Sequence, residues 1–359
     1  MALPTQRDPE ETRKRLREWL AAQLPGAGDI EVGEIGGPAY SGYSHETLIF
    51  DATWTRDGVE EKHGFVARIE PSAHSVFFEP DVGVEMRVMK ALEGTGVLVP
   101  RIHWFEEDPS VLGARFIVMD RVEGVIPPDN PPYTFGGWLL DATPEQQADV
   151  WWTGLEAMAA VHRLDPDSLG LDFLLRHDGA PGADSEMAEL HRYVDRVCGE
   201  KRIETLDAGL AWLEAHRPAG AEPVRLCWGD SRLGNQIFHD YQCAALLDWE
   251  MATLASPEQD LAWFLYFDRF FSLGLGVARP PGFPSREDSI AHYTEITGLS
   301  VSHIPFYEVM ASLRFGAVMV RLGHLMVGSG GLPEGTDLDS NNFAVQALGK
   351  LLEDYGSSP

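Results

Sequence analysis

The stretch that decides the fold is Trp228-Gly229-Asp230-Ser231-Arg232-Leu233-Gly234-Asn235, followed by Leu247-Asp248-Trp249-Glu250. It combines Asp-x-x-x-x-Asn with a second aspartate, Asp248, thirteen positions after Asn235. Phosphoryl transfer needs a carboxylate that orients and deprotonates an attacking hydroxyl, and oxygen ligands for Mg²⁺ ions that bridge nucleotide phosphates. Asp230, Asn235 and Asp248 are the residue types that supply all three. Any one of them alone is more typical of a turn or a helix cap.

The residues before this stretch predict a helix and then a sheet. Asp8-Pro9-Glu10-Glu11 is typical of a helix start, and we expect that helix to end at Pro25-Gly26. From Ile30 to Glu70 the pattern changes to strand-like runs separated by a glycine-serine segment and an Arg-Asp-Gly turn, which predicts three antiparallel strands. A helical pattern over 82–96 and two more strand-like runs, over 100–108 and 113–122, complete this part.

The residues after a proline-rich link, VIPPDNPPY, are mostly helical in pattern. Thr143-Pro144-Glu145-Gln146 predicts a capped helix start. Further helices are expected over about 186–217, 257–272, 285–297, 305–327 and 339–355, with short strands in RLCWGD and QIFHDYQCAALLDWE. A mostly β part joined to a mostly α part predicts an α+β architecture with a cleft between them.

Charge and cysteine content narrow the functional classes. The net charge of −28 and the pI near 4.7 make binding to nucleic acid or to anionic membranes unlikely on electrostatic grounds. The three cysteines form no C-x-x-C pair, the charged N-terminus lacks the apolar segment of a secretory signal, and the apolar stretch FGAVMVRLGHLMVG is interrupted by Arg321 and His324. We therefore expect a cytoplasmic protein, as a monomer or a homodimer, with no membrane or nucleic-acid partner.

Searches for other catalytic motifs exclude several classes. The sequence contains no G-x-x-x-x-G-K-[ST], no G-x-G-x-x-G and no H-E-x-x-H, which argues against a Walker loop, a Rossmann fingerprint and the commonest helical zinc site. Gly229-Asp230-Ser231 is shared with the GDS-type esterases, which need an Asp-x-x-His pair. None of the twelve histidines has an aspartate three positions before it. A serine without a positioned base is a poor nucleophile, so we set the hydrolase interpretation aside.

From about Ile30 to Phe271 the chain resembles the aminoglycoside phosphotransferase and choline kinase family, the small-molecule branch of the protein-kinase-like fold. The resemblance implies a two-lobed fold, with 30–122 as an antiparallel, nucleotide-binding N-lobe and 123–359 as a mostly α-helical C-lobe with catalytic and acceptor sites. We expect the helix within residues 1–29 to pack on the lobes. The same resemblance implies Asp230 as the catalytic base and Asn235 and Asp248 as Mg²⁺ ligands. Arg232 either neutralises the transferred phosphate or braces the loop.

The resemblance also implies nucleotide-binding residues in the N-lobe. Ser44 lies in GGPAYSGYSHETLIF, which resembles the family's phosphate-covering loop. Arg68 stands where the third strand carries its phosphate-pairing lysine, and Glu85 stands where the next helix offers the ion-pair glutamate. Main-chain groups near Asp120 and Val122 are expected at the adenine edge. Arginine holds phosphate bidentately, so the presence of Arg68 in place of the lysine changes the expected geometry of the phosphate contact.

Three further residues differ from, or match, the family pattern in the C-lobe. Trp228 replaces the usual histidine before Gly-Asp, which we expect to change the packing beneath the loop and to remove one hydrogen bond. Asp260 matches an aspartate that braces the catalytic loop. His162 is more typical of a core histidine with satisfied hydrogen bonds than of a catalytic group.

These observations predict an ATP- and Mg²⁺-dependent phosphotransferase that acts on the hydroxyl of a small molecule, with GTP as the alternative nucleotide. A non-catalytic nucleotide-binding or scaffold member of the fold is one alternative, and a kinase of hydroxyacyl thioesters is another. Trp249 and aromatic residues in the helices after Pro257 are candidates for the acceptor pocket, although an aromatic stripe at helical spacing is more often core. They are Trp249, Trp263, Tyr266, Phe267, Phe270 and Tyr307.

Overall fold

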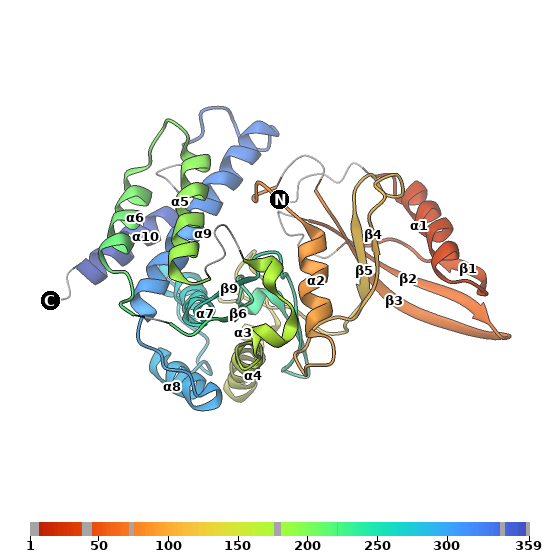
Figure 1. Ribbon diagram of the computed structural model, residues 1–359, viewed down its shortest axis with the longest axis horizontal. Helices are drawn as coiled ribbons and strands as arrows, with labels where there is room; N and C mark the ends of the chain where they lie inside the picture. Colours follow the sequence, from red (N-terminus) through yellow and green to blue (C-terminus); the bar gives the residue numbers. More distant parts are fainter. Residues whose placement is uncertain are drawn as a thin grey trace. The chain divides into compact units, whose positions relative to one another are not determined.

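The computed structural model describes residues 7–37, 45–71, 75–175, 181–220, 222–337 and 342–356. The chain divides into two compact units, the first of Met1–Glu93 and Val99–Glu123 and the second of Gly94–Leu98 and Gly124–Pro359. A five-stranded sheet belongs to the first unit, and most of the helices belong to the second (Figure 1). This segregation confirms the predicted α+β fold.

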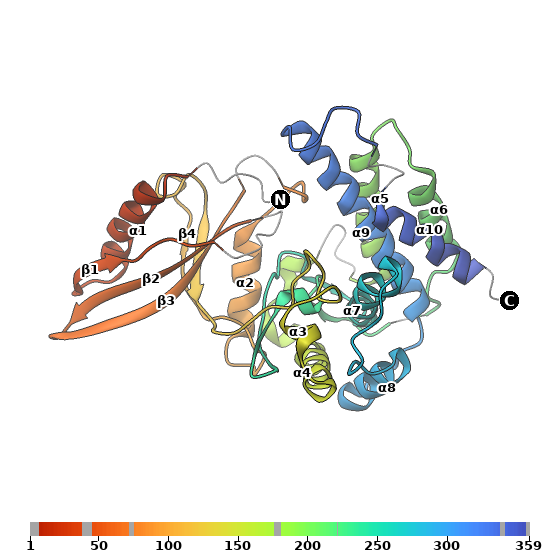
Figure 2. The same cartoon turned by 180° about the vertical axis from the view of Figure 1, so that it is seen from behind.

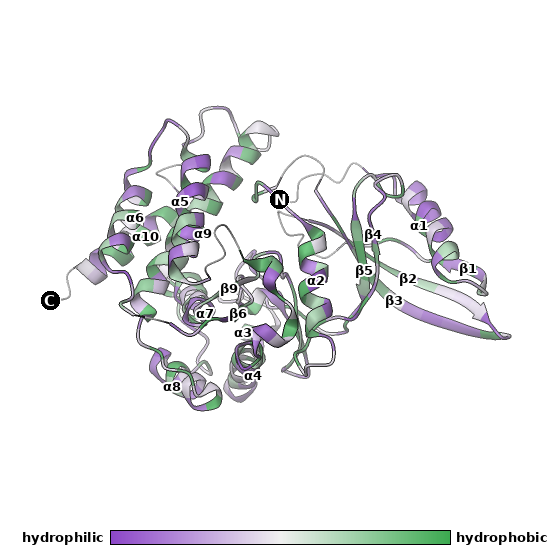
Figure 3. Ribbon diagram, in the orientation of Figure 1, coloured by the Kyte–Doolittle hydropathy of each residue, from purple (hydrophilic) through white to green (hydrophobic). Residues whose placement is uncertain are grey.

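The first unit is built on an antiparallel sheet with the strand order β1-β2-β3-β5-β4. Its strands are β1 (Gly28–Val32), β2 (Glu46–Arg56), β3 (Val59–Ile69), β4 (Ile102–Glu106) and β5 (Phe116–Asp120). Strands β2 and β3 pair along their full length, from Glu46 opposite Ile69 to Arg56 opposite Val59. Near its turn, β3 is hydrophilic over residues 60–63 (Figure 3), whereas its inner half alternates buried and half-buried positions. The inner half of the hairpin therefore carries the core.

Helix α1 (Pro9–Gln23) covers one face of this sheet. It begins where the Asp8 side chain accepts hydrogen bonds from the backbone N–H groups of Glu10 and Glu11. Its apolar side packs on alternate residues of the central strands, and the Trp19 indole donates to Glu106 at 2.7 Å. The core of this face contains Leu16, Trp19 and Leu20 of the helix with Phe50, Phe65 and Val118 of the sheet. The N-terminal helix is thus an integral part of the first unit.

Helix α2 (Val82–Leu92) lies beside β4 and β5 (Figure 2). The Asp81 side chain caps it by accepting from the N–H of Gly83. Arg68 alternates along β3 with the buried Ala67 and Ile69, so it points to the face opposite the α1 core. The ion pair between Arg68 and Glu85 of α2 places the helix on that opposite face.

The second unit is mostly helical. Its helices are α3 (Trp138–Asp141), α4 (Pro144–His162), α5 (Ala183–Cys198), α6 (Glu204–Ala215), α7 (Glu258–Phe271), α8 (Arg286–Thr297), α9 (Ile304–Gly328) and α10 (Phe343–Gly356). Two small antiparallel sheets pair β6 (Arg225–Cys227) with β9 (Thr253–Ala255) and β7 (Gln236–His239) with β8 (Gln242–Leu246). The predicted cap of α4 is confirmed, because Thr143 and Gln146 exchange the reciprocal hydrogen bonds of a capping box.

Helix α9 is the central helix of this unit, because α5, α6, α7 and α10 all pack against it (Figure 1). Among the helices that the structure describes, it alone is long and apolar enough by composition to cross a membrane. However, 61% of its most apolar window is buried within the protein. Its apolar character is that of a core helix.

Two features of the second unit differ from the prediction. The pattern over 186–217 forms two helices, α5 and α6, because the chain turns at Gly199, which has a positive φ of 57°. Strand β9 was not predicted, since three buried residues are too few to show an alternating pattern.

Candidate active site

The loop between β6 and β7 carries the predicted catalytic residues, and Asp260 of α7 holds its backbone. The Asp260 carboxylate accepts from the N–H groups of Trp228 at 2.5 Å and Gly229 at 2.8 Å. The Asp260 carbonyl accepts from the Ser231 hydroxyl at 2.7 Å. Gly229 has φ +94°, and a Cβ there would lie 2.2 Å from the carbonyl oxygen of Met251, so only glycine fits. The start of the loop is therefore fixed before any ligand binds.

Three side chains orient the Asp230 carboxylate. Its Oδ1 accepts from Arg232 Nε at 2.9 Å and from the Trp263 indole at 2.8 Å. Its Oδ2 accepts from Asn235 Nδ2 at 2.7 Å. The Asp230 side chain is only 16% exposed, which limits competition from water. These contacts leave the carboxylate little rotational freedom.

Arg232 lies between two carboxylates. Its Nε bonds to Asp230 and its Nη1 forms an ion pair with Asp129, while the guanidinium lies over the Phe267 ring at 5.6 Å. Burial lowers the pKa of Arg232, but the charges of Asp129 and Asp230 outweigh it and raise the pKa above the ordinary value. The guanidinium therefore stays charged. Of the two roles predicted for Arg232, this geometry favours bracing the loop.

Asp129 is a site residue that the sequence did not reveal. Burial raises its pKa, while the charge of Arg232 acts in the opposite direction. It packs against Gly234, where an added Cβ would lie 2.4 Å from its Oδ1. Asp129 lies in the proline-rich link, 103 positions before Arg232, and no local motif marks it.

The predicted metal ligands lie on adjoining backbone segments. The N–H of Leu247 donates to the carbonyl of Asn235 at 2.9 Å, which places Asp248 next to the residue paired with Asn235. Asp248 has a φ of +65°, which is uncommon for a non-glycine residue. Asn235 is buried and its Nδ2 donates to Asp230, so its Oδ1 is turned away from that carboxylate. A carboxylate and an amide oxygen are hard ligands and fit Mg²⁺.

Trp228, which stands where the family usually has histidine, makes a side-chain hydrogen bond to the neighbouring segment. Its side chain is fully buried, and its indole N–H donates to the carbonyl of Leu247 at 2.8 Å. The ring packs near Trp249, with centroids 5.9 Å apart. The effect of replacing histidine on the packing beneath the loop stays a prediction, but the Trp228 side chain ties the loop to the segment that carries Asp248.

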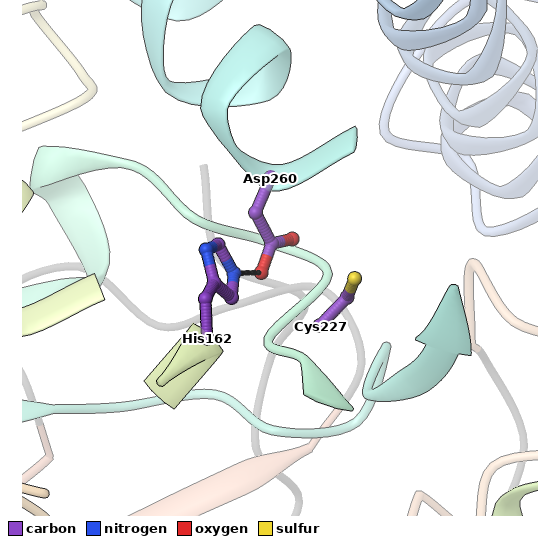
Figure 4. Close-up of side chains that lie close together, drawn as sticks. All are labelled: His162, Cys227 and Asp260. Atoms are coloured by element: carbon purple, nitrogen blue, oxygen red, sulfur yellow. Dashed lines mark hydrogen bonds and ion pairs between the residues drawn. The ribbon is translucent and has the colours of Figure 1, made fainter. Parts of the chain in front are cut away.

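His162, Cys227 and Asp260 lie close together beneath the loop, with one ligand atom of each within 4.8 Å of the others (Figure 4). The two ring nitrogens of His162 contact Asp260 at 3.0 Å and the Tyr293 hydroxyl at 2.7 Å. The Cys227 thiol donates to the Ser256 carbonyl at 3.3 Å, and burial raises its pKa. Because Asp260 is also occupied by two backbone N–H groups, this cluster is a braced core network rather than a metal site. His162 is the satisfied core histidine that the sequence favoured.

In the first unit, Arg68 and Glu85 form the predicted ion pair. Arg68 Nε lies 3.1 Å from Glu85 Oε2, and the Glu85 side chain is 1% exposed. Arg68 Nη2 also lies 3.3 Å from His45 Nδ1. Ser44, the predicted phosphate-loop residue, lies outside the residues that the structure describes.

The segment predicted to contact adenine begins at the last residue of β5. The N–H of Asp120 donates to the carbonyl of Arg101 at 2.9 Å, so the carbonyl is the main-chain group of Asp120 that is the candidate for an adenine contact. The next N–H, of Arg121, donates to Gly64. Val122, the other predicted adenine contact, follows these two residues whose N–H groups bond to neighbouring segments. Its role stays a prediction.

The aromatic candidates for an acceptor pocket are core residues. Trp249, Trp263, Tyr266, Phe267, Phe270 and Tyr307 are all buried, none more than 8% exposed. Two of the six contact polar groups of the loop: Trp263 bonds to Asp230, and Phe267 underlies Arg232. The burial of all six is that of core residues, which is the commoner role of such a stripe.

The sheet of the first unit, the helical second unit and the Asp230 loop together define the protein-kinase-like fold. The model of the phosphotransferase enzyme family matches residues 48–280, and the chain belongs to that family.

The chain is also similar to individual proteins. The chain is 26% identical over 311 residues to acyl-CoA dehydrogenase family member 11 of Rattus norvegicus, an alignment that covers 84% of this chain and 38% of the relative. The chain therefore spans well under half the length of that protein. A protein from Ralstonia eutropha, provisionally assigned as an aminoglycoside phosphotransferase, has a solved structure with a TM-score of 0.71 at 23% identity, covering 96% of this chain and 98% of the other. The GDP complex of an aminoglycoside 2'-phosphotransferase-IIIa variant gives 0.61 at 14% identity, covering 96% and 99%. These similarities between structures concern the fold.

Proposed function

We propose that this protein transfers the γ-phosphate of ATP to the hydroxyl group of a small molecule in a Mg²⁺-dependent reaction. The Asp230 carboxylate carries the proposal, because three side-chain donors hold it in one orientation on the loop that leads to Asn235. A fixed, partly exposed carboxylate suits a general base, which must meet the attacking hydroxyl at hydrogen-bond distance. Membership of the phosphotransferase family supports this role.

In the proposed reaction, Asp230 accepts a hydrogen bond from the acceptor hydroxyl. It takes the proton as the hydroxyl oxygen bonds to the γ-phosphorus, and the bond to the β,γ-bridging oxygen breaks to release ADP. Asn235 and Asp248 would hold Mg²⁺, which supplies compensation of phosphate charge when bound. Catalysis then rests on positioning and electrostatics, as expected of this reaction class.

The first unit contributes the nucleotide contacts in this proposal. Arg68, oriented by the buried carboxylate of Glu85, would pair with phosphate oxygens. The carbonyl of Asp120 and the backbone of Val122 would meet the base. GTP is the alternative nucleotide, and the GDP complex of a structural relative supports testing it.

A hydroxyacyl thioester is the acceptor class that we test first. The support is the name of the relatives, acyl-CoA dehydrogenase family member 11, with which this chain aligns over 84% of its length. Aminoglycosides and choline are the alternatives suggested by the wider family resemblance. The alternative of a non-catalytic nucleotide-binding protein is an outcome of the same experiment.

The test measures transfer of radioactive γ-phosphate from Mg-ATP to hydroxyacyl-CoA, choline and aminoglycoside panels, alongside a thermal-shift titration with Mg-ATP. We expect Asp230→Asn to lower turnover about 10²- to 10⁴-fold, the usual contribution of a general base, while the thermal shift persists. Asp240→Asn is the matched control, because its side chain is 94% exposed on the β7–β8 turn. Nucleotide binding without hydrolysis or transfer would favour the non-catalytic alternative, and a missing thermal shift would contradict the proposal altogether.

A further inference from the structure

Helix α7 holds the catalytic loop at two points. Asp260 binds the loop backbone at Trp228 and Gly229, and Trp263, three residues later on the helix, binds the side chain of Asp230. Residues three apart lie on the same side of a helix. One face of α7 therefore fixes both the path of the loop and the direction of its carboxylate.

We propose that Trp263 is a positioning residue for Asp230 and that Oδ2 of Asp230 is the oxygen that receives the proton of the acceptor. This inference rests on the proposed function, because it assigns the geometry of the same base. It differs from the aromatic-pocket interpretation, in which Trp263 would contact the acceptor directly.

Counting hydrogen-bond positions identifies the oxygen. An ionised carboxylate offers about four lone-pair positions, two on each oxygen. Among the described residues, Arg232 and Trp263 occupy the two positions of Oδ1, and Asn235 occupies one of the two on Oδ2. The fourth position is therefore on Oδ2, which is where an acceptor hydroxyl can donate.

The surroundings of Trp263 make it a rigid support. The residue is 3% exposed, and its ring packs on Phe267 with centroids 5.1 Å apart. Phe267 in turn lies beneath the Arg232 guanidinium, which is shared with Asp129. Without the indole N–H, Oδ1 would keep only Arg232, a donor that a second carboxylate also attracts. The carboxylate would then rotate, and a displacement of about 1 Å at a reacting group can cost about 100-fold in rate.

The kinetic test compares Trp263→Phe with Trp151→Phe, using the hydrolysis of Mg-ATP so that no acceptor need be known. Trp151 is a matched control, since it is fully buried, donates through its indole to Ser289 at 3.0 Å and packs on Phe264 of the same helix. We expect Trp263→Phe to lower kcat about 10- to 100-fold with the KM for Mg-ATP within about twofold. Trp151→Phe should lower thermal stability but leave kcat within about twofold.

A second readout observes the hydrogen bond without catalysis. In ¹⁵N-labelled protein, the indole N–H signal missing from Trp263→Phe identifies Trp263, and the one missing from Trp151→Phe identifies the control. Asp230→Asn should move the Trp263 signal upfield, because a bond to a carboxylate is stronger than one to an amide. The Trp151 signal should stay.

The outcomes separate this inference from the proposed function. If the unsubstituted protein neither hydrolyses Mg-ATP nor transfers phosphate, the proposed function fails and the role of Trp263 fails with it. If it is active but Trp263→Phe keeps its kcat, or if Asp230→Asn leaves the Trp263 signal in place, only the positioning role is overturned.

Discussion

For Asp268, on α7, we predict an unusual effect: removing its buried ion pair should increase the free energy of unfolding. Its carboxylate is buried and pairs with Arg279 Nε at 2.5 Å. Burial raises its pKa to about 6, and the Arg279 charge offsets only part of that rise. Ionisation is therefore easier in the unfolded chain than in the folded one. An acid with a raised pKa destabilises the folded protein as pH increases from the unfolded pKa through the folded one. We predict that Asp268→Asn stabilises the protein above pH 6, although it removes an ion pair.

The magnitude follows from the two pKa values. The folded pKa of about 6 against the ordinary 3.8 is a shift of about two units, equivalent to about 3 kcal/mol in full. About half of that change falls between pH 5 and pH 8. At about 2–4 °C per kcal/mol for a domain of this size, the difference in Tm between Asp268→Asn and the unsubstituted protein should grow by about 3–6 °C over that range.

The remaining contacts of Arg279 make the substitution tolerable. Its Nη1 donates to the Pro284 carbonyl at 2.6 Å, and its guanidinium lies 5.1 Å from the Trp151 ring centroid. The side chain thus keeps partners when the carboxylate is neutral, as it does in the protonated protein.

The assay is thermal unfolding at pH 5, 6, 7 and 8, always as a difference from the unsubstituted protein so that other titrating groups cancel. Asp354→Asn is the control, since Asp354 pairs with Arg269 at 2.5 Å but both side chains are exposed. We expect its difference in Tm to be small and independent of pH. The reasoning would be refuted if the difference in Tm between Asp268→Asn and the unsubstituted protein did not change with pH, or if Asp268→Asn had the lower Tm at pH 8.

Three further substitutions test the loop and the first unit. Gly229→Ala should destabilise the protein by at least about 2 kcal/mol, because its φ of +94° and the nearby Met251 carbonyl exclude a Cβ; an unchanged Tm would contradict this. Gly234→Ala should push Asp129 away from Arg232 and lower Mg-ATP hydrolysis less than Asp230→Asn does, since the Arg232–Asp230 bond remains. Arg68→Lys keeps the charge but loses the guanidinium fork, so calorimetry should show several-fold weaker Mg-ATP binding; an unchanged Kd would remove Arg68 from the phosphate site.

The features that the sequence predicted well are those fixed by neighbouring residues. The start of α1 was predictable because Asp8 and Pro9 are a cap and a first-turn proline within three residues of the bonds that they form. Asp230 and Asn235 were expected at one site for the same reason, since both lie in one loop, although the hydrogen bond between them was not predicted. The bend at Gly199 was missed because a helical pattern continues on both sides of it.

The residues that the sequence did not reveal are joined to the loop from far along the chain. Asp129 contacts Arg232 although 103 positions separate them in the sequence. The proline-rich link that contains Asp129 has no periodic pattern that would indicate where its side chain points. Periodicity cannot identify such a contact, because it describes which face of an element is buried and not which element covers it. The loop contacts of Asp129 and Trp263 depend on how the second unit packs.

Helix α7 shows why the sequence left the roles of its individual aromatic residues open. Every residue of this helix except Arg269 is buried, so its apolar pattern has no exposed face from which a direction could be inferred. Pocket wall, core residue and support for the base therefore look alike in sequence. What separates Trp263 from its neighbours is a single polar atom, the indole nitrogen, placed 2.8 Å from a carboxylate that other elements have already positioned. Since a buried indole N–H needs an acceptor, the bond satisfies Trp263 and orients Asp230 at the same time. Packing and the proposed chemistry share one contact at this point of the fold.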